Sequence, residues 1–136
     1  MAQELFIDAS AWVALAHTKD QDHEAAKETY SHAFQNYQKF VTTNLVIAET
    51  HAILRRRMGY APAIQFLNAL EKSLRVLYVY SAEDLETAAK EILRKYKDQD
   101  FSYADAVSFA LMKHRGITDV FTYDEHFRVM GFRIIK

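Results

Sequence analysis

Cysteine is absent from this 136-residue chain, which excludes disulfides, thiolate metal ligands and cysteine-based catalysis. An excess of one charge is also lacking, since 17 Lys and Arg face 18 Asp and Glu for a formal net charge of −1. Bulk attraction to a polyanion is therefore excluded, and any nucleic-acid contact must come from a local patch. Near the N-terminus there is no basic stretch, and Asp8 and Ser10 break the apolar run, so we expect neither a signal peptide nor a membrane span. The expected location is cytoplasmic.

Turn-forming residues are few, with one proline and three glycines, and no repeat, linker or low-complexity segment divides the chain. At this length, with 50% hydrophobic residues, we expect a single domain over residues 1–136 with one core. Gly59, Gly116 and Gly131 each follow a segment with helical spacing, and each is predicted to end that helix in a left-handed conformation.

Short apolar runs alternate with helical segments along the chain. Strands are predicted at 5–7, 40–42, 75–80, 119–122 and 132–135, and helices at 11–16, 22–39, 44–58, 62–74, 81–96, 103–115 and 125–130. Ser10 and Asn44 are the predicted N-caps of the first and third helices. Apolar strands separated by helices favour a parallel sheet covered on both faces, and in such sheets ligands bind beyond the carboxyl ends of the strands.

Four acidic residues are flanked by apolar sequence at the predicted ends of strands or within helices: Asp8, Glu49, Asp105 and Asp124. Two of them follow strands directly, and the other two lie in helices that a parallel sheet would bring alongside. Because a buried, unpaired anion is costly, their convergence would require a counter-ion. Mg²⁺ prefers oxygen ligands, so these four carboxylates are the candidate metal ligands and catalytic residues.

Each acid also has a local interpretation. Asp8 and Asp124 are ordinary helix N-cap residues, and the segment that ends at Asp105 has the spacing of a capping box. Glu49 lies in mid-helix on a predicted apolar face, where a buried salt bridge with Arg56 is the alternative. These explanations are independent of one another, whereas a metal site accounts for all four acids with one cause.

Together these segments resemble those of PIN-domain ribonucleases of the VapC toxin type, over essentially the whole chain. The segments are Phe6-Ile7-Asp8-Ala9-Ser10, Val46-Ile47-Ala48-Glu49, Tyr103-Ala104-Asp105-Ala106 and Phe121-Thr122-Tyr123-Asp124-Glu125-His126-Phe127. The resemblance implies a three-layer α/β/α sandwich with a central, mostly parallel sheet. It also implies a Mg²⁺- or Mn²⁺-dependent endoribonuclease, frequent homodimerisation and a cognate antitoxin protein that blocks the site.

By this resemblance the four acids form the catalytic, metal-binding site, and Ser10 and Thr122 occupy positions where such enzymes often carry a hydroxyl near the metal. Asn44 is a departure, because many relatives have Ser or Thr at that position. His126 is close in sequence to a candidate acid, but we interpret it as a surface helix residue without a catalytic role.

Hydrolysis of an RNA phosphodiester needs an in-line nucleophile and stabilisation of charge on the phosphoryl oxygens, and a divalent ion supplies both. Attack of water at phosphorus would leave a 5′-phosphate and a 3′-hydroxyl. Basic residues are the candidates for RNA contact, with solvated helix ends as the alternative interpretation. They are Arg55-Arg56-Arg57, Arg94, Lys95, Lys97, His114, Arg115 and Arg128.

Two other functions compete with the nuclease interpretation. A phosphotransfer receiver or phosphatase-like domain also gathers acids around Mg²⁺, but it needs a lysine at a late strand end, where this chain has Thr122 and Ile135. A non-catalytic, PIN-like RNA-binding or assembly module would bind metal without cleaving RNA. Cleavage assays with and without metal distinguish this module from a nuclease.

Overall fold

The computed structural model describes the backbone of residues 2–136 and the side chains from residue 4 onward. Five strands form one sheet in the order β3-β2-β1-β4-β5, and every neighbouring pair is parallel. The strands are β1 (Ala2–Ile7), β2 (Tyr37–Thr43), β3 (Val76–Val79), β4 (Asp119–Phe121) and β5 (Arg133–Ile135). Because all strands run in the same direction, their carboxyl ends meet at one edge of the sheet.

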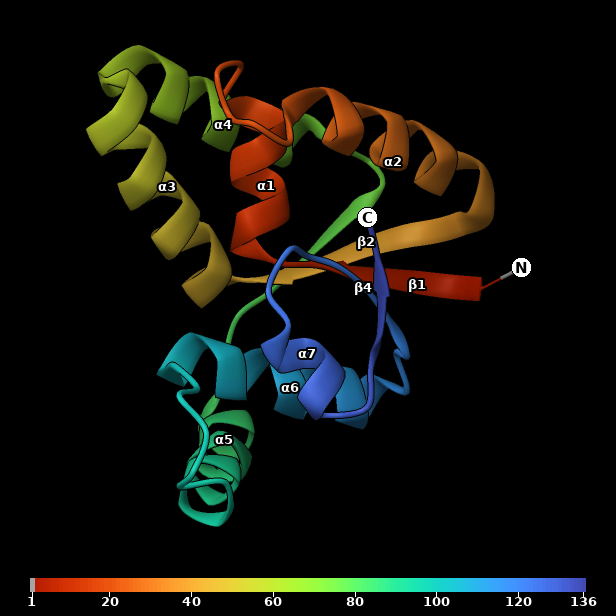
Figure 1. Cartoon of the computed structure of the whole chain (residues 1–136), viewed down its shortest axis with the longest axis vertical. Coiled ribbons are helices and arrows are strands. Elements are labelled where there is room, and N and C mark those ends of the chain that lie inside the picture. Colours follow the sequence, from red (N-terminus) through yellow and green to blue (C-terminus); the bar gives the residue numbers. More distant parts are fainter. Residues whose placement is uncertain (1) are drawn as a thin grey trace.

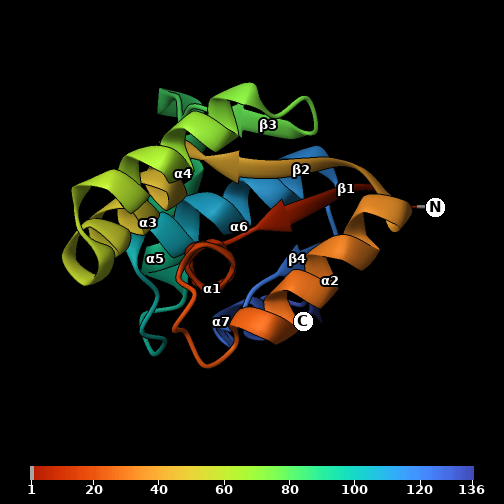
Figure 2. The ribbon, with the colours of Figure 1, turned by 90° about the horizontal axis from the view of Figure 1, so that it is seen from above.

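Helices cover both faces of this sheet (Figure 1). On one face lie α1 (Ala9–Ala16), α2 (His23–Asn36), α3 (Asn44–Met58) and α4 (Tyr60–Lys72); on the other lie α5 (Glu83–Lys95), α6 (Tyr103–Arg115) and α7 (His126–Val129). In the view from above, α1 and α3 begin at the arrowheads of β1 and β2 (Figure 2). The predicted three-layer sandwich with a parallel sheet is confirmed.

Apolar strand residues explain why the sheet is central. Leu5, Phe6 and Ile7 of β1 are fully buried, as expected for a strand with helices on both faces. The middle strand β1 is tied to β2 and α1 through Thr42, whose hydroxyl donates to the carbonyl of Ile7 and accepts from the indole N–H of Trp12. Among the described residues, no helix has the length and apolar character needed to cross a membrane.

Both predicted N-caps are wrong by one or two residues. The cap of α1 is Asp8, and Ser10 lies in the first turn of the helix. The cap of α3 is Thr43, whose hydroxyl accepts from the backbone N–H of Val46 at 3.1 Å. Asn44 is the first residue of α3 and instead accepts a bond from the backbone N–H of Ser81 at 2.8 Å. The side chains of Ser10 and Asn44 instead bind backbone groups that are distant in the sequence.

The predicted ends of two helices at glycines are confirmed. Gly116 closes α6 in the left-handed conformation, with a φ of 70°. Gly59 closes α3 with a φ of 96° and a ψ of −176°, a conformation outside the left-handed region predicted for it. Such backbone is accessible almost only to glycine, and here it lets α4 begin immediately after α3.

Candidate active site

Asp8 lies at the carboxyl end of the middle strand. Its backbone N–H donates to the carbonyl of Phe121 at 3.1 Å, which holds it beside the end of β4. The side chain is only 7% exposed and makes no capping bond to α1, although its backbone occupies the cap position. Its Oδ2 atom accepts from the hydroxyl of Thr122 at 3.0 Å, while the hydroxyl of Ser10 lies 3.5 Å away. The N-cap interpretation therefore does not explain this carboxylate.

The two hydroxyls fix the loop that follows β4. Ser10 Oγ and Thr122 Oγ1 are 3.1 Å apart. Ser10 accepts from the backbone N–H of Tyr123 at 2.9 Å, and Thr122 accepts from that of Asp124 at 3.0 Å. Because each hydroxyl has one proton, donation by Thr122 to Asp8 leaves Ser10 as the donor between the pair. The hydroxyl pair thus sets the positions of Asp8 and Asp124 together.

Asp105 lies in the first turn of α6 and forms the predicted capping box. Its backbone N–H donates to the hydroxyl of Ser102 at 3.0 Å, and its Oδ2 atom accepts from the backbone N–H of Ser102 at 3.1 Å. The capping role does not consume the carboxylate, since Oδ2 also faces Nδ1 of His126 at 3.3 Å. Only 13% of the Asp105 side chain is exposed. Capping and participation in the site therefore coexist at Asp105.

Asp124 and His126 form a tight turn after β4. Oδ1 of Asp124 accepts from the backbone N–H of His126 at 2.9 Å and lies 3.3 Å from its Nδ1 atom. The cap of α7 is Glu125, so the predicted capping position of Asp124 is wrong by one residue. His126 is in a helix, as expected, but it is only partly at the surface. Its side chain is 30% exposed, and the ring packs edge-on against Phe101 with centroids 5.2 Å apart.

The sequence contains one local signal for the position of His126. An Asp whose side chain accepts from the backbone two residues later forms an Asx-turn, which folds that later residue back toward the carboxylate. The spacing of Asp124 and His126 is consistent with such a turn. The contact between His126 and Asp105, by contrast, depends on how α6 and α7 pack, and no local sequence pattern predicts it.

Glu49 approaches from α3, on the opposite side of the sheet from α6. The residue is exposed, so the predicted apolar face is wrong. Within residues 4–136 it makes no ion pair, which removes the alternative of a salt bridge with Arg56. Although the residue as a whole is exposed, partial desolvation of its carboxylate raises its pKa, and the negative charges of Asp105 and Asp124 raise it further.

The acids act on one another electrostatically. Burial raises the pKa of Asp8 to about 7, against the lowering effect of bonds from Ala9 and Thr122, and the negative charges of Asp105 and Glu49 add to the increase. The pKa of Asp105 is also raised, chiefly by burial and then by the charge of Asp124, against the lowering bonds from Ser102 and His126. The four candidate acids therefore share one negative field. In the described part of the chain, none of them pairs with a lysine or arginine.

Another buried acid shows what a matched carboxylate looks like in this fold. Asp119, at the opposite end of β4, is 4% exposed. It accepts two bonds from the guanidinium of Arg133, at 2.8 and 3.1 Å, and one from the hydroxyl of Tyr37 at 2.6 Å. These partners, Arg133 first, hold its pKa below the usual value. Among the described residues, the acids at the carboxyl ends of the strands have no arginine or lysine partner, as expected of residues that hold a cation.

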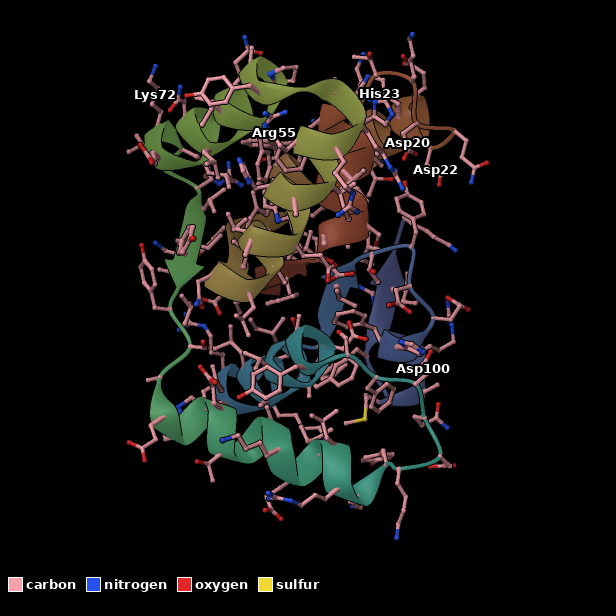
Figure 3. The ribbon with its side chains drawn as sticks, turned by 90° about the vertical axis from the view of Figure 1, so that its left-hand side faces the viewer. Asp20, Asp22, His23, Arg55, Lys72 and Asp100 are labelled. Carbon is pink, nitrogen blue, oxygen red and sulfur yellow. The ribbon has the colours of Figure 1, made fainter. Side chains whose placement is uncertain are left out.

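Three side chains at this edge are close enough to bind a single ion. Asp105, Asp124 and His126 each offer one ligand atom, and these atoms lie within 4.8 Å of one another. Asp8 and Glu49 lie outside this three-atom group but couple to it through their charges. The donor set of carboxylate oxygens with one imidazole nitrogen fits a divalent cation. Figure 3 views this end of the molecule, with Asp20 and Asp22 on the α1–α2 loop and Asp100 on the α5–α6 loop.

Comparison with known proteins places this chain in a family. The PIN domain family model matches residues 5–133. The chain belongs to the PIN domain family. Over 128 residues it is 33% identical to the 23S rRNA-specific endonuclease VapC20 of Mycobacterium tuberculosis, covering 94% of this chain and 95% of the relative. It is 28% identical over 127 residues to ribonuclease VapC26 of the same species, covering 93% and 91%.

Solved structures agree with the PIN assignment. The crystal structure of M. tuberculosis VapC20, described as a sarcin-ricin loop cleaving toxin, matches with a TM-score of 0.86 and 32% identity over 94% of this chain and 95% of that one. FitAcB from Neisseria gonorrhoeae matches with a TM-score of 0.63 and 14% identity over 100% and 97% of the two chains, which supports the fold alone. The resemblance to VapC-type PIN domains is confirmed.

Proposed function

We propose that this PIN domain protein is a divalent-metal-dependent endoribonuclease and the toxin of a toxin–antitoxin pair. The observation that carries the proposal is the group of four carboxylates at the carboxyl edge of a parallel sheet, none of which pairs with a lysine or arginine among the described residues. Its support is the 33% identity, over 94% of the chain, to a relative named as an rRNA-specific endonuclease. We place the whole activity in one domain over residues 1–136.

The side chains divide the catalytic work between binding and proton transfer. Asp105 and Asp124 would hold the ion, and Asp8 would join them through the oxygen that does not accept from Thr122. A divalent ion held there supplies Lewis-acid stabilisation of charge on the scissile phosphate and lowers the pKa of water. Glu49, at the exposed rim with a raised pKa, suits the role of general base that orients the attacking water and takes its proton. The products would carry a 5′-phosphate and a 3′-hydroxyl.

The proposed substrate class rests on the names of the relatives. We propose RNA, with a ribosomal RNA loop of the kind cleaved by VapC20 as the first substrate to test. The partners proposed are a cognate antitoxin that covers the site and a second copy of the chain. The proposed location is cytoplasmic. A non-catalytic module that binds RNA is the alternative, and it predicts binding without strand cleavage.

The deciding experiment compares cleavage by three proteins on a panel of labelled RNAs, with Mg²⁺, with Mn²⁺ and with chelator. Asp105→Asn should lose roughly 100-fold or more of the cleavage rate, because it removes one ligand charge while keeping the shape of the side chain. Asp100→Asn, an exposed acid on the same face (Figure 3), is the matched control and should retain the wild-type rate. Circular dichroism checks that each variant is folded.

Two outcomes would contradict the proposal. Undiminished cleavage by Asp105→Asn would refute the assignment of the active site. Metal-dependent RNA binding without cleavage by the wild type would favour the non-catalytic RNA-binding module.

A further inference from the structure

We propose that the imidazole of His126 is a nitrogen ligand in the metal site, and that the site therefore selects Mn²⁺ over Mg²⁺. This inference rests on the proposed metal-dependent function and concerns which ion the site holds. Its basis is the position of one ring nitrogen between two carboxylates that come from different elements of the fold.

Nδ1 of His126 is placed equally close to both acids. It lies 3.3 Å from Oδ2 of Asp105 and 3.3 Å from Oδ1 of Asp124. The contact with Asp105 is a hydrogen bond at the long end of the usual range, and the contact with Asp124 is an ion-pair contact at the same distance. A single ring proton also cannot serve two acceptors well. The ligand atoms of the three residues lie within 4.8 Å of one another, a separation that the ligands of one ion can have.

The ring is held in this orientation from two sides. The backbone N–H of His126 donates to the same Oδ1 atom of Asp124, which fixes the start of the side chain. Phe101, buried beneath α6 and α7, packs against the ring at an interplanar angle of 78°. An imidazole anchored at both ends loses little conformational freedom when it binds an ion, and this pre-organisation favours binding.

A nitrogen donor changes the choice of ion. Mg²⁺ is hard, demands oxygen ligands and gives up water reluctantly. Carboxylate and water suit Mg²⁺ and Mn²⁺ alike, whereas imidazole is a ligand of first-row transition ions, of which Mn²⁺ is one and Mg²⁺ is not. A site with Asp105, Asp124 and His126 as the first ligands should therefore bind Mn²⁺ more tightly than Mg²⁺, by about tenfold or more.

The direct test is electron spin-echo spectroscopy of Mn²⁺ bound to the intact protein, because a coordinated imidazole produces modulation from its nitrogen nucleus. The wild type should show this modulation, and His126→Ala should lack it. His114→Ala, which removes an exposed histidine at the other end of α6, is the matched control and should keep it. Wild-type protein that binds Mn²⁺ without nitrogen modulation would overturn the inference.

Calorimetric titration with Mn²⁺ and Mg²⁺ provides the second measurement. His126→Asp replaces the nitrogen by oxygen, so it should still bind metal while the ratio of the Mg²⁺ and Mn²⁺ dissociation constants falls by about tenfold. A merely structural role for the histidine predicts no change in this ratio. Both measurements use metal alone. Nitrogen modulation in a protein that cleaves no RNA would contradict only the proposed nuclease function. RNA cleavage without nitrogen modulation would contradict only the proposal that His126 is a metal ligand.

Discussion

Two buried aspartates give the clearest contrast at the scale of single residues. Asp119 is surrounded by a guanidinium and a phenol that match its charge, and its pKa is lowered. Asp8 has only hydroxyl and backbone donors, lies near other acids, and has a pKa raised to about 7. The same fold therefore stabilises the charged form of Asp119 and destabilises that of Asp8. Mutations at the two positions should have opposite effects on stability.

Asp8→Asn should abolish RNA cleavage and raise the melting temperature in metal-free buffer at pH 8. The pKa of Asp8 is raised from 3.8 to about 7 in the folded state. Protonated Asp8 therefore contributes fully to the free energy of unfolding below about pH 4, and this contribution is lost as the pH rises through about 7. The gain from Asn is thus on the order of a few kcal/mol at pH 8 and shrinks toward pH 4. Thermal unfolding in chelator across this pH range measures it. A variant that is less stable than the wild type at pH 8 contradicts the account.

Asp119→Asn should have the opposite effect. Because the folded-state pKa of Asp119 is depressed, its contribution is present above the unfolded value near 3.8 and is lost as the pH falls through the folded value. We expect a loss of roughly 1–3 kcal/mol at pH 7, since the bonds from Arg133 and Tyr37 lose their charged acceptor. Urea unfolding at pH 7 and pH 3 tests this, and an equal deficit at both values would contradict it.

What the sequence predicted at this scale was the set of four acids; what it missed was the surroundings of each one. Apolar flanks marked Asp8 as a residue of the core because strand burial is a local property. The apolar residues around Glu49 wrongly predicted that it is buried, because the face of a helix that meets solvent depends on its tertiary neighbours. His126 was missed for the same reason, since its partner Asp105 is 21 positions away in the sequence.

At the scale of elements, α3 connects the acidic site to positive charge. Glu49, Ile53 and Arg57 are spaced by four residues and therefore share one side of the helix. Ile53 and Arg57 line a hollow of about 200 Å³, and its other lining residues are Ser10, Val13, Asp20, Asp22 and Tyr123. Because Arg57 shares a side of α3 with Glu49 and a hollow with Ser10, we expect it to contact a phosphate next to the scissile one. Arg94, Arg115 and Arg128 are instead paired with glutamates.

Arg57→Ala should weaken RNA binding and reduce the slope of log K against log salt by about one, as expected for the loss of one phosphate contact. The measurement is fluorescence anisotropy with a labelled RNA and the cleavage-deficient Asp105→Asn protein at several salt concentrations. Arg55→Ala is the matched control, because its guanidinium lies over the ring of Tyr60, 6.0 Å from the centroid. Equal slopes for the two variants would remove the special role of Arg57.

Element types were predicted well and their ends less well. Strand and helix periodicity is a local property, so all five strands and seven helices were placed. The N-caps were not, because Ser10 binds the N–H of Tyr123 and Asn44 binds that of Ser81. Both partners belong to other elements, and a capping preference cannot anticipate them.

At the scale of the whole molecule, apolar strands separated by helices predicted the parallel sandwich. The order β3-β2-β1-β4-β5 was not deduced, because it depends on which connections cross over the sheet. This order places β1 between β2 and β4, so that Asp8 has a hydroxyl-bearing strand end on each side.

Metal should therefore stabilise the entire fold. An ion that neutralises the strained carboxylates binds only the folded chain, and at about 100 times its dissociation constant it would add about 2.7 kcal/mol to the free energy of unfolding. Differential scanning calorimetry with Mn²⁺ and with chelator checks this. Asp119→Asn should keep the full increment, whereas Asp124→Asn should lose most of it. An increment of the same size in Asp124→Asn would place the ion elsewhere.

The bond between Thr122 and Asp8 joins positions 114 residues apart. A ribosome must therefore release the chain at least as far as Thr122 before the two parts of the site can meet. Incomplete translation products would carry Asp8 and Glu49 but no means of assembling them into a working centre. For a protein proposed to attack RNA, this makes synthesis itself a safeguard: the translating machinery meets only inert chain until the final strands have emerged and docked.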